Sequence, residues 1–174
     1  MFEGWDSFYL LIGGAAGALI GLLFIVVTLM RGGDAATQLR AASVFMTPTV
    51  AHLAMVLLLS ALATAPGVSA AATGMIFEAF ALVCLAFAAR AVVMLGSKAI
   101  KASHWSDIWT YGAAPFAACL ALALSAAAVW LSPVWAARGI AASLMGLLLI
   151  AIRNAWDLVT WISAKGDQLD KDPG

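Results

Sequence analysis

The sequence contains few charged residues. Only 10% of the 174 residues are Asp, Glu, Lys or Arg, against about 25% in ordinary soluble domains. The formal net charge is zero, so no basic surface indicates a nucleic-acid partner. Hydrophobic residues make up 64% of the chain, and mean hydropathy is +1.02. This composition is typical of a protein whose partner is the lipid bilayer.

Catalytic and cofactor motifs are also missing. The chain has no phosphate-binding glycine loop, no Gly-x-Ser-x-Gly elbow and no His-Glu-x-x-His, so it nominates no catalytic residue and is not expected to be an enzyme. No lysine lies in mid-span, which excludes a retinal Schiff base. Only one of the two histidines, His52, lies inside an apolar run, which excludes haem ligation by two histidines of one chain. No cofactor or metal is expected.

Cysteine is scarce as well. Cys84 and Cys119 both lie inside apolar runs, and their spacing fits neither a disulfide framework nor a zinc site. A buried free cysteine behaves as a small apolar residue. Counted along their helices, the two cysteines lie at similar depths in the third and fourth predicted spans. We therefore expect them to mark a packing contact between these spans rather than a redox site.

Long apolar runs fill the rest of the chain. A membrane-spanning helix needs about 20 apolar residues, and breaks rich in Gly, Pro or charge separate the runs. The sequence therefore predicts an all-α fold, a five-helix transmembrane bundle in a single domain. The expected spans are residues 6–30, 41–64, 71–95, 107–131 and 133–161, followed by a flexible tail at 162–174. The acidic start, with Glu3 and Asp6, favours a retained first span over a signal peptide.

Basic residues are distributed unequally between the two sides of the predicted bundle. One side carries the first and third loops and the tail, with Arg31, Arg40, Lys98, Lys101, Lys165 and Lys171. The opposite side has only Arg138. By the positive-inside rule the N-terminus lies outside and the C-terminus in the cytoplasm. All seven tryptophans fall near span ends, as interfacial belts require.

Two titratable residues fall well inside the predicted spans. His52 lies near the middle of the second span and Glu78 near the middle of the third. The turn at residues 65–67 makes these spans antiparallel neighbours, so the two side chains are expected at similar depths. Such a pair either relays protons or holds a cation, or it is a hydrogen-bonded pair that fixes helix packing.

A second polar layer is expected nearer the cytoplasmic side. Arg153 and Asp157 are four residues apart, so they can pair on one helix face. The layer is either a polar vestibule or anionic-headgroup pocket, or a set of snorkelling arginines with one local ion pair. Its members are Thr47, Thr49, Arg90, Tyr111, Arg153, Asn154 and Asp157.

Glycines recur every four residues in the first span, at Gly13, Gly17 and Gly21. Small residues at this spacing let another helix approach closely. The ridge serves either a close helix crossing within one chain, or a contact between copies or a pore-lining face. We expect the protein to form a homo-oligomer.

Three stretches carry a family resemblance: Phe8 to Phe24 with its glycines, Thr47 to His52, and Ile152 to Asp157. They resemble small bacterial multi-span inner-membrane proteins. The resemblance covers about a third of the chain, implies the bacterial inner membrane and brings no known activity.

Three functions are compatible with these features. The first is conduction or transport of protons or a small cation by an oligomer, along a path through His52 and Glu78. The second is a non-catalytic accessory subunit of a larger membrane complex. The third is a sensor that binds a lipid or amphiphile at the cytoplasmic basic layer.

Overall fold

The structure is a computed structural model, which describes residues 2–29, 47–96 and 109–169. This part of the chain is helical and contains no strand. Its α-helices are α1 (Asp6–Leu29), α3 (Thr47–Ala63), α4 (Ala70–Gly96), α6 (Ala114–Ala127) and α7 (Pro133–Leu169). A π-helical turn, η2 (Trp109–Ala113), precedes α6, and a 3-10 turn, η3 (Ala128–Trp130), follows it.

Proline and glycine set several of these boundaries. Pro48 lies in the first turn of α3, and Pro133 is the first residue of α7. A proline costs no helical hydrogen bond in a first turn, where the N–H has no partner within the helix. Gly67 has a φ of +76°, a conformation that glycine adopts without strain. The tight turn that the sequence predicts between the second and third spans is therefore confirmed.

The π-helical turn η2 has a local cause. Pro115 stands at the start of α6. A proline has no N–H to donate, and its ring crowds the carbonyl four residues earlier. That carbonyl belongs to Tyr111, inside η2. We attribute the wider turn to this crowding, which delays the regular helix until Ala114.

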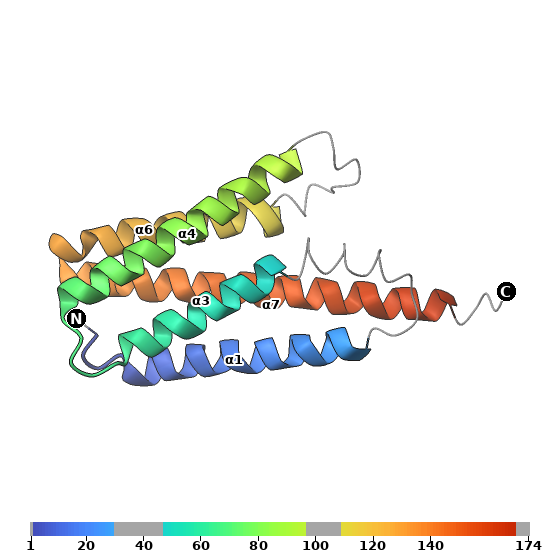
Figure 1. Ribbon diagram of the computed structural model, residues 1–174, viewed down its shortest axis with the longest axis horizontal. Coiled ribbons are helices and arrows are strands. Elements are labelled where there is room, and N and C mark those ends of the chain that lie inside the picture. The colour runs from blue at the N-terminus through green and yellow to red at the C-terminus, as the bar shows by residue number, and fades with distance from the viewer. Residues whose placement is uncertain (1, 30–46, 97–108, 170–174) are drawn as a thin grey trace.

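The helices pack as two pairs around α7 (Figure 1). The most extensive contacts are those of α1 with α3 and of α4 with α6. The α7 helix packs against α6, α3 and α1, so it joins the two pairs. Although α3 and α4 are consecutive, they meet over a shorter stretch. The sequence correctly makes them neighbours, but neither is the other's main partner.

One buried stripe per helix forms the core. On α4 it consists of Thr73, Phe77, Ala81, Cys84 and Ala88, spaced three or four residues apart as on one helix face. Large apolar side chains also stand exposed on the outer faces of the bundle. They include Leu10, Leu11, Phe24, Phe87, Val93 and Leu124. The helices are therefore apolar on both their buried and their exposed sides.

Four described helical segments are long and apolar enough to cross a membrane: Asp6–Val26, Ala70–Arg90, Trp109–Trp130 and Pro133–Asp157. The fifth, α3, has 17 residues, or about 26 Å at 1.5 Å per residue. The start expected for this span, at residue 41, lies outside the described residues. The α7 helix continues to Leu169, past the end expected for this span at residue 161, and the flexibility expected for residues 162–174 stays a prediction.

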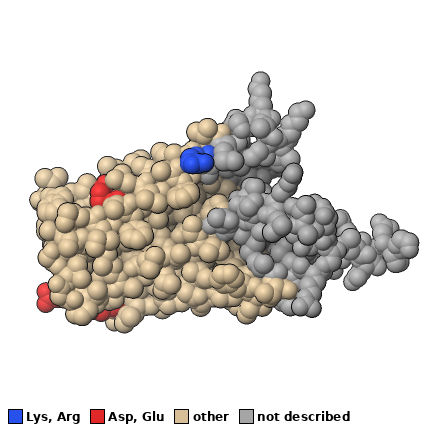
Figure 2. All heavy atoms as spheres, in the orientation of Figure 1, with Lys and Arg blue, Asp and Glu red and all other residues tan. Residues whose placement is uncertain are grey.

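Charged atoms are sparse on the described surface (Figure 2). In this view the Asp and Glu atoms lie toward the end where α1 and α7 begin, and the Lys and Arg atoms lie nearer the other end. Most of the described surface between them is uncharged.

Candidate functional site

A buried cluster of nitrogen and sulfur atoms lies where α3, α4 and α6 meet. His52 on α3, Cys84 on α4 and Cys119 on α6 each offer one ligand atom, and these atoms lie within 4.8 Å of one another. The exposed fractions of the three residues are 6%, 1% and 0%. Three helices that are separate in the sequence thus bring their most reactive side chains to one point in the core.

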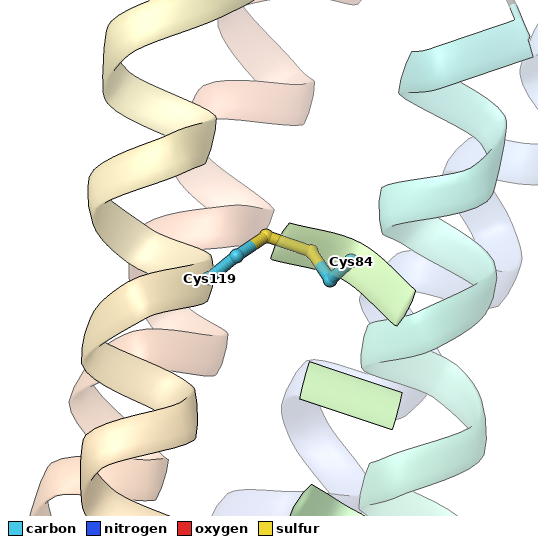
Figure 3. Close-up of a disulfide and its surroundings, with 2 residues drawn as sticks. All are labelled: Cys84 and Cys119. Atoms are coloured by element: carbon cyan, nitrogen blue, oxygen red, sulfur yellow. A yellow bond between two sulfur atoms is a disulfide. The ribbon is translucent and has the colours of Figure 1, made fainter. Parts of the chain in front are cut away.

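The two cysteines form a disulfide between α4 and α6 (Figure 3). Their Cα atoms are 5.8 Å apart, within the usual range for such bonds. The expected packing contact between the third and fourth spans is confirmed. The expectation of free thiols is wrong, because counting depth predicts how far along each helix a residue lies but not which way it faces. Equal depth was the only sequence signal of the pairing.

The structure brings His52 to the cysteines, and no hydrogen bond or ion pair joins it to Glu78 among the described residues. Glu78 comes six residues before Cys84 on α4, or about 9 Å along the axis. Glu78 is half-buried. His52 and Glu78 therefore occupy different levels of the bundle.

Several buried polar atoms have no hydrogen-bond partner in the described part of the chain. One group belongs to the half of the bundle where α1 begins. Ser60 lies against Gly13, one helical turn from Tyr9, and Glu78 lies on the same side of the Cys84 level. The other atoms come from His52, at the level of the disulfide, and from Asn154, beyond it. The set is Tyr9 Oη, Ser60 Oγ, Glu78 Oε2, His52 Nδ1 and Asn154 Oδ1.

Tyr9 and Ser60 are buried polar residues that the sequence pattern does not predict. Tyr9 is fully buried and lies edge-on to Phe2, with ring centroids 5.0 Å apart. Ser60 is 2% exposed. Each is a lone polar side chain in an apolar run, and that weak signal also fits a lipid-facing residue.

Part of the expected cytoplasmic layer assembles around Asn154. The Asn154 side-chain amide donates to the Thr110 carbonyl at 3.3 Å, and the Tyr111 hydroxyl donates to the Asn154 carbonyl at 3.4 Å. These two bonds connect α7 to the π-helical turn η2. Thr49 is buried and has a partner of its own. The side chain of Thr47 lies outside the described residues.

The basic residues of that layer face outward. Arg153 pairs with Asp157, as their spacing predicts. Their side chains are 51% and 37% exposed, and an exposed pair contributes only about 0–1 kcal/mol to stability. Arg90 is also exposed. The structure thus separates Arg90, Arg153 and Asp157 from the buried contact between Asn154, Thr110 and Tyr111.

The glycine ridge of α1 has two sides. A Cβ at Gly13 would lie 2.9 Å from Cβ of Ser60, and one at Gly17 would lie 3.9 Å from Leu57. Gly14 and Gly21 are exposed, with no atom within 4 Å of an added Cβ. Gly13 and Gly17 therefore face α3 of the same chain. The homo-oligomer stays a prediction.

A pocket of about 340 Å³ opens at the end of the bundle where α1 begins. It lies between the start of α1 and the turn from α3 to α4, and Glu3, Asp6, Thr64 and Thr73 supply its polar lining. Thr73 belongs to the buried stripe of α4, so the pocket adjoins the core on the side of Tyr9 and Glu78.

No protein-family model, curated protein or solved structure matches this chain.

Proposed function

We propose that the bundle is an integral membrane protein that lets protons or small cations cross the membrane along a hydrated line of buried polar groups. The observation that carries the proposal is the set of five buried polar atoms without a hydrogen-bond partner among the described residues. Buried polar groups ordinarily have partners, protein or water. Polar groups inside a membrane bundle mark ion and proton pathways.

These atoms are spread along the bundle axis rather than gathered at one point. Eight residues separate Ser60 from His52 on α3, or about 12 Å. A similar interval separates Cys119, beside His52, from Tyr111, beside Asn154. Each gap spans roughly four hydrogen-bond lengths, which about three waters in line would bridge. Water linking the three levels would satisfy the unpartnered atoms and form a path narrow enough to favour protons.

The acidic pocket supplies an entrance to this path. Glu3 and Asp6 lie where α1 begins, and carboxylates at the mouth of a cleft concentrate cations there. We place this end outside the cell and the C-terminus in the cytoplasm, in a bacterial inner membrane. The exposed apolar side chains on the outer faces of the helices would then contact lipid.

Proton and cation flux into liposomes that contain the purified protein tests the proposal. Glu78→Gln removes a titratable carboxyl from the path and keeps its size, so we expect flux to fall by at least about tenfold, the scale of a 1.4 kcal/mol barrier. Glu78→Asp keeps the carboxyl and should retain more flux than Glu78→Gln.

Met75→Leu is the matched control, because Met75 is exposed on α4 about one turn before Glu78. This variant should conduct as the wild type does. Absence of flux in the wild type, across pH and with a potential applied, would reject conduction and favour an accessory role in a larger membrane complex.

A further inference from the structure

The second inference concerns the cluster at the centre of the bundle and does not depend on conduction. We propose that Cys84 and Cys119, once reduced, bind one Cu(I) ion together with His52. The disulfide seen in the structure is then the oxidised, metal-free form of the same site.

The arrangement of the donors is the first argument. One atom from each residue lies within 4.8 Å of the other two. An ion held at about 2.0–2.3 Å by nitrogen and sulfur ligands in a trigonal plane spaces its donors roughly 3.5–4 Å apart. When the disulfide is reduced, its two sulfur atoms move apart. Rotation of the three side chains then brings the donor atoms to the spacing that the ion requires.

The second argument is the state of His52. His52 is only 6% exposed, and its Nδ1 atom has no hydrogen-bond partner among the described residues. A buried nitrogen without a partner is costly. Coordination of a metal would satisfy one imidazole nitrogen of a side chain that already lies beside two sulfur atoms.

The donor set favours a thiophilic ion of low coordination number. Thiolate sulfur selects Cu(I), zinc and iron–sulfur clusters, and imidazole suits copper and zinc. Structural zinc takes four ligands, whereas in the described part of the chain no fourth His, Cys, Asp or Glu joins this group. Two thiolate sulfurs and one imidazole complete the coordination of Cu(I), so Cu(I) is the better match.

The chemistry of loading balances with a thiol reductant. Two reductant thiols form a disulfide and pass two electrons and two protons to the Cys84–Cys119 bond, which becomes two thiols. Cu(I) then displaces both thiol protons to the surroundings and forms two copper–sulfur bonds, with the neutral imidazole as the third donor. The loaded site carries one net negative charge, because one Cu(I) offsets only one of the two thiolates.

The test uses the full chain in detergent, divided into an oxidised and a reduced sample. Each is titrated with Cu(I) against a chromophoric Cu(I) chelator under anaerobic conditions, and bound metal is measured by mass spectrometry. The reduced protein should bind one copper per chain. The oxidised protein has the same sequence, and its affinity for Cu(I) should be at least about tenfold lower, which corresponds to 1.4 kcal/mol.

Three variants separate the ligands from the fold. Cys84→Ala should weaken binding by more than about 100-fold, since even loss of an outer-shell partner costs 10–100-fold. His52→Ala should keep the two sulfurs and lose the nitrogen from the copper X-ray absorption spectrum. Met55→Leu removes a different buried sulfur of α3 and should bind as the wild type does.

Equal copper binding by the reduced and oxidised samples would overturn the proposal. So would unchanged binding by Cys84→Ala, an unchanged nitrogen signal in His52→Ala, or a preference of the reduced protein for Zn(II) over Cu(I). None of these readouts depends on flux, so this proposal and the proposed conduction can fail separately.

Discussion

At the scale of single residues, neighbouring glycines of α1 have opposite surroundings. A Cβ on Gly13 would collide with Cβ of Ser60 at 2.9 Å, while a Cβ on Gly14 meets no atom within 4 Å. The atom in the way is Cβ of Ser60, whose position is fixed by the backbone, so a change of side-chain rotamer cannot relieve the clash. Gly13 therefore sets how closely α1 and α3 approach.

We predict that Gly13→Ala destabilises the bundle by about 1–3 kcal/mol, the usual cost of overpacking. Gly14→Ala, where an added Cβ meets no neighbouring atom, should be neutral or stabilise the bundle by up to about 1 kcal/mol, because alanine has the higher helix propensity. Reversible unfolding of both variants in mixed micelles with rising denaturing detergent measures the difference. Equal effects of the two substitutions would show that α1 does not pack on α3 through Gly13.

At the scale of elements, the disulfide and the π-helical turn both act on the pair of α4 and α6. The disulfide joins residues 35 apart, and the two bonds of Asn154 connect η2 to α7. The pair is thus linked covalently within itself and by hydrogen bonds to the central helix.

We predict that the double substitution Cys84→Ala with Cys119→Ala lowers the free energy of unfolding by about 2–4 kcal/mol, as loss of a native disulfide does. The cause is the greater freedom of the unfolded chain once the loop is no longer closed. A reductant should produce the same loss in the wild type and no change in the double variant. Stability of the wild type that is insensitive to reductant would contradict this prediction.

At the scale of the whole molecule, the proposed orientation places opposite ends of the bundle on opposite sides of the membrane. Ser69, in the turn before α4, and Thr160, near the far end of α7, are both exposed. These two positions can therefore report on sidedness without disturbing the core.

We predict that in a chain without native cysteines, Ser69→Cys reacts with a membrane-impermeant maleimide added to intact cells. Thr160→Cys should react only after the membrane is permeabilised. The two variants serve as each other's control, and mass-shift gels after labelling provide the measurement. The opposite pattern would reverse the orientation inferred from the positive-inside rule.

Much of the element structure could be predicted from the sequence alone. Apolar length predicts the helices, and four of them are long enough to cross a membrane. Pro133 and Gly67 mark a helix start and a turn because their effects on φ and on the backbone N–H are local. The pairing of Arg153 with Asp157 follows from the helical repeat. All these features depend on residues close together in the chain.

Only the tertiary structure decided which faces meet. A helix that is apolar on all sides has no polar face to fix its rotation, so residue depth can be counted while direction cannot. For this reason the sequence could suggest His52 beside Glu78, whereas the bundle brings His52 to Cys84 and Cys119. The same rotations join the two cysteines in a disulfide and bury Tyr9 and Ser60. Close packing of small residues at a few helix crossings, such as Gly13 on Ser60, is the physical cause of that choice.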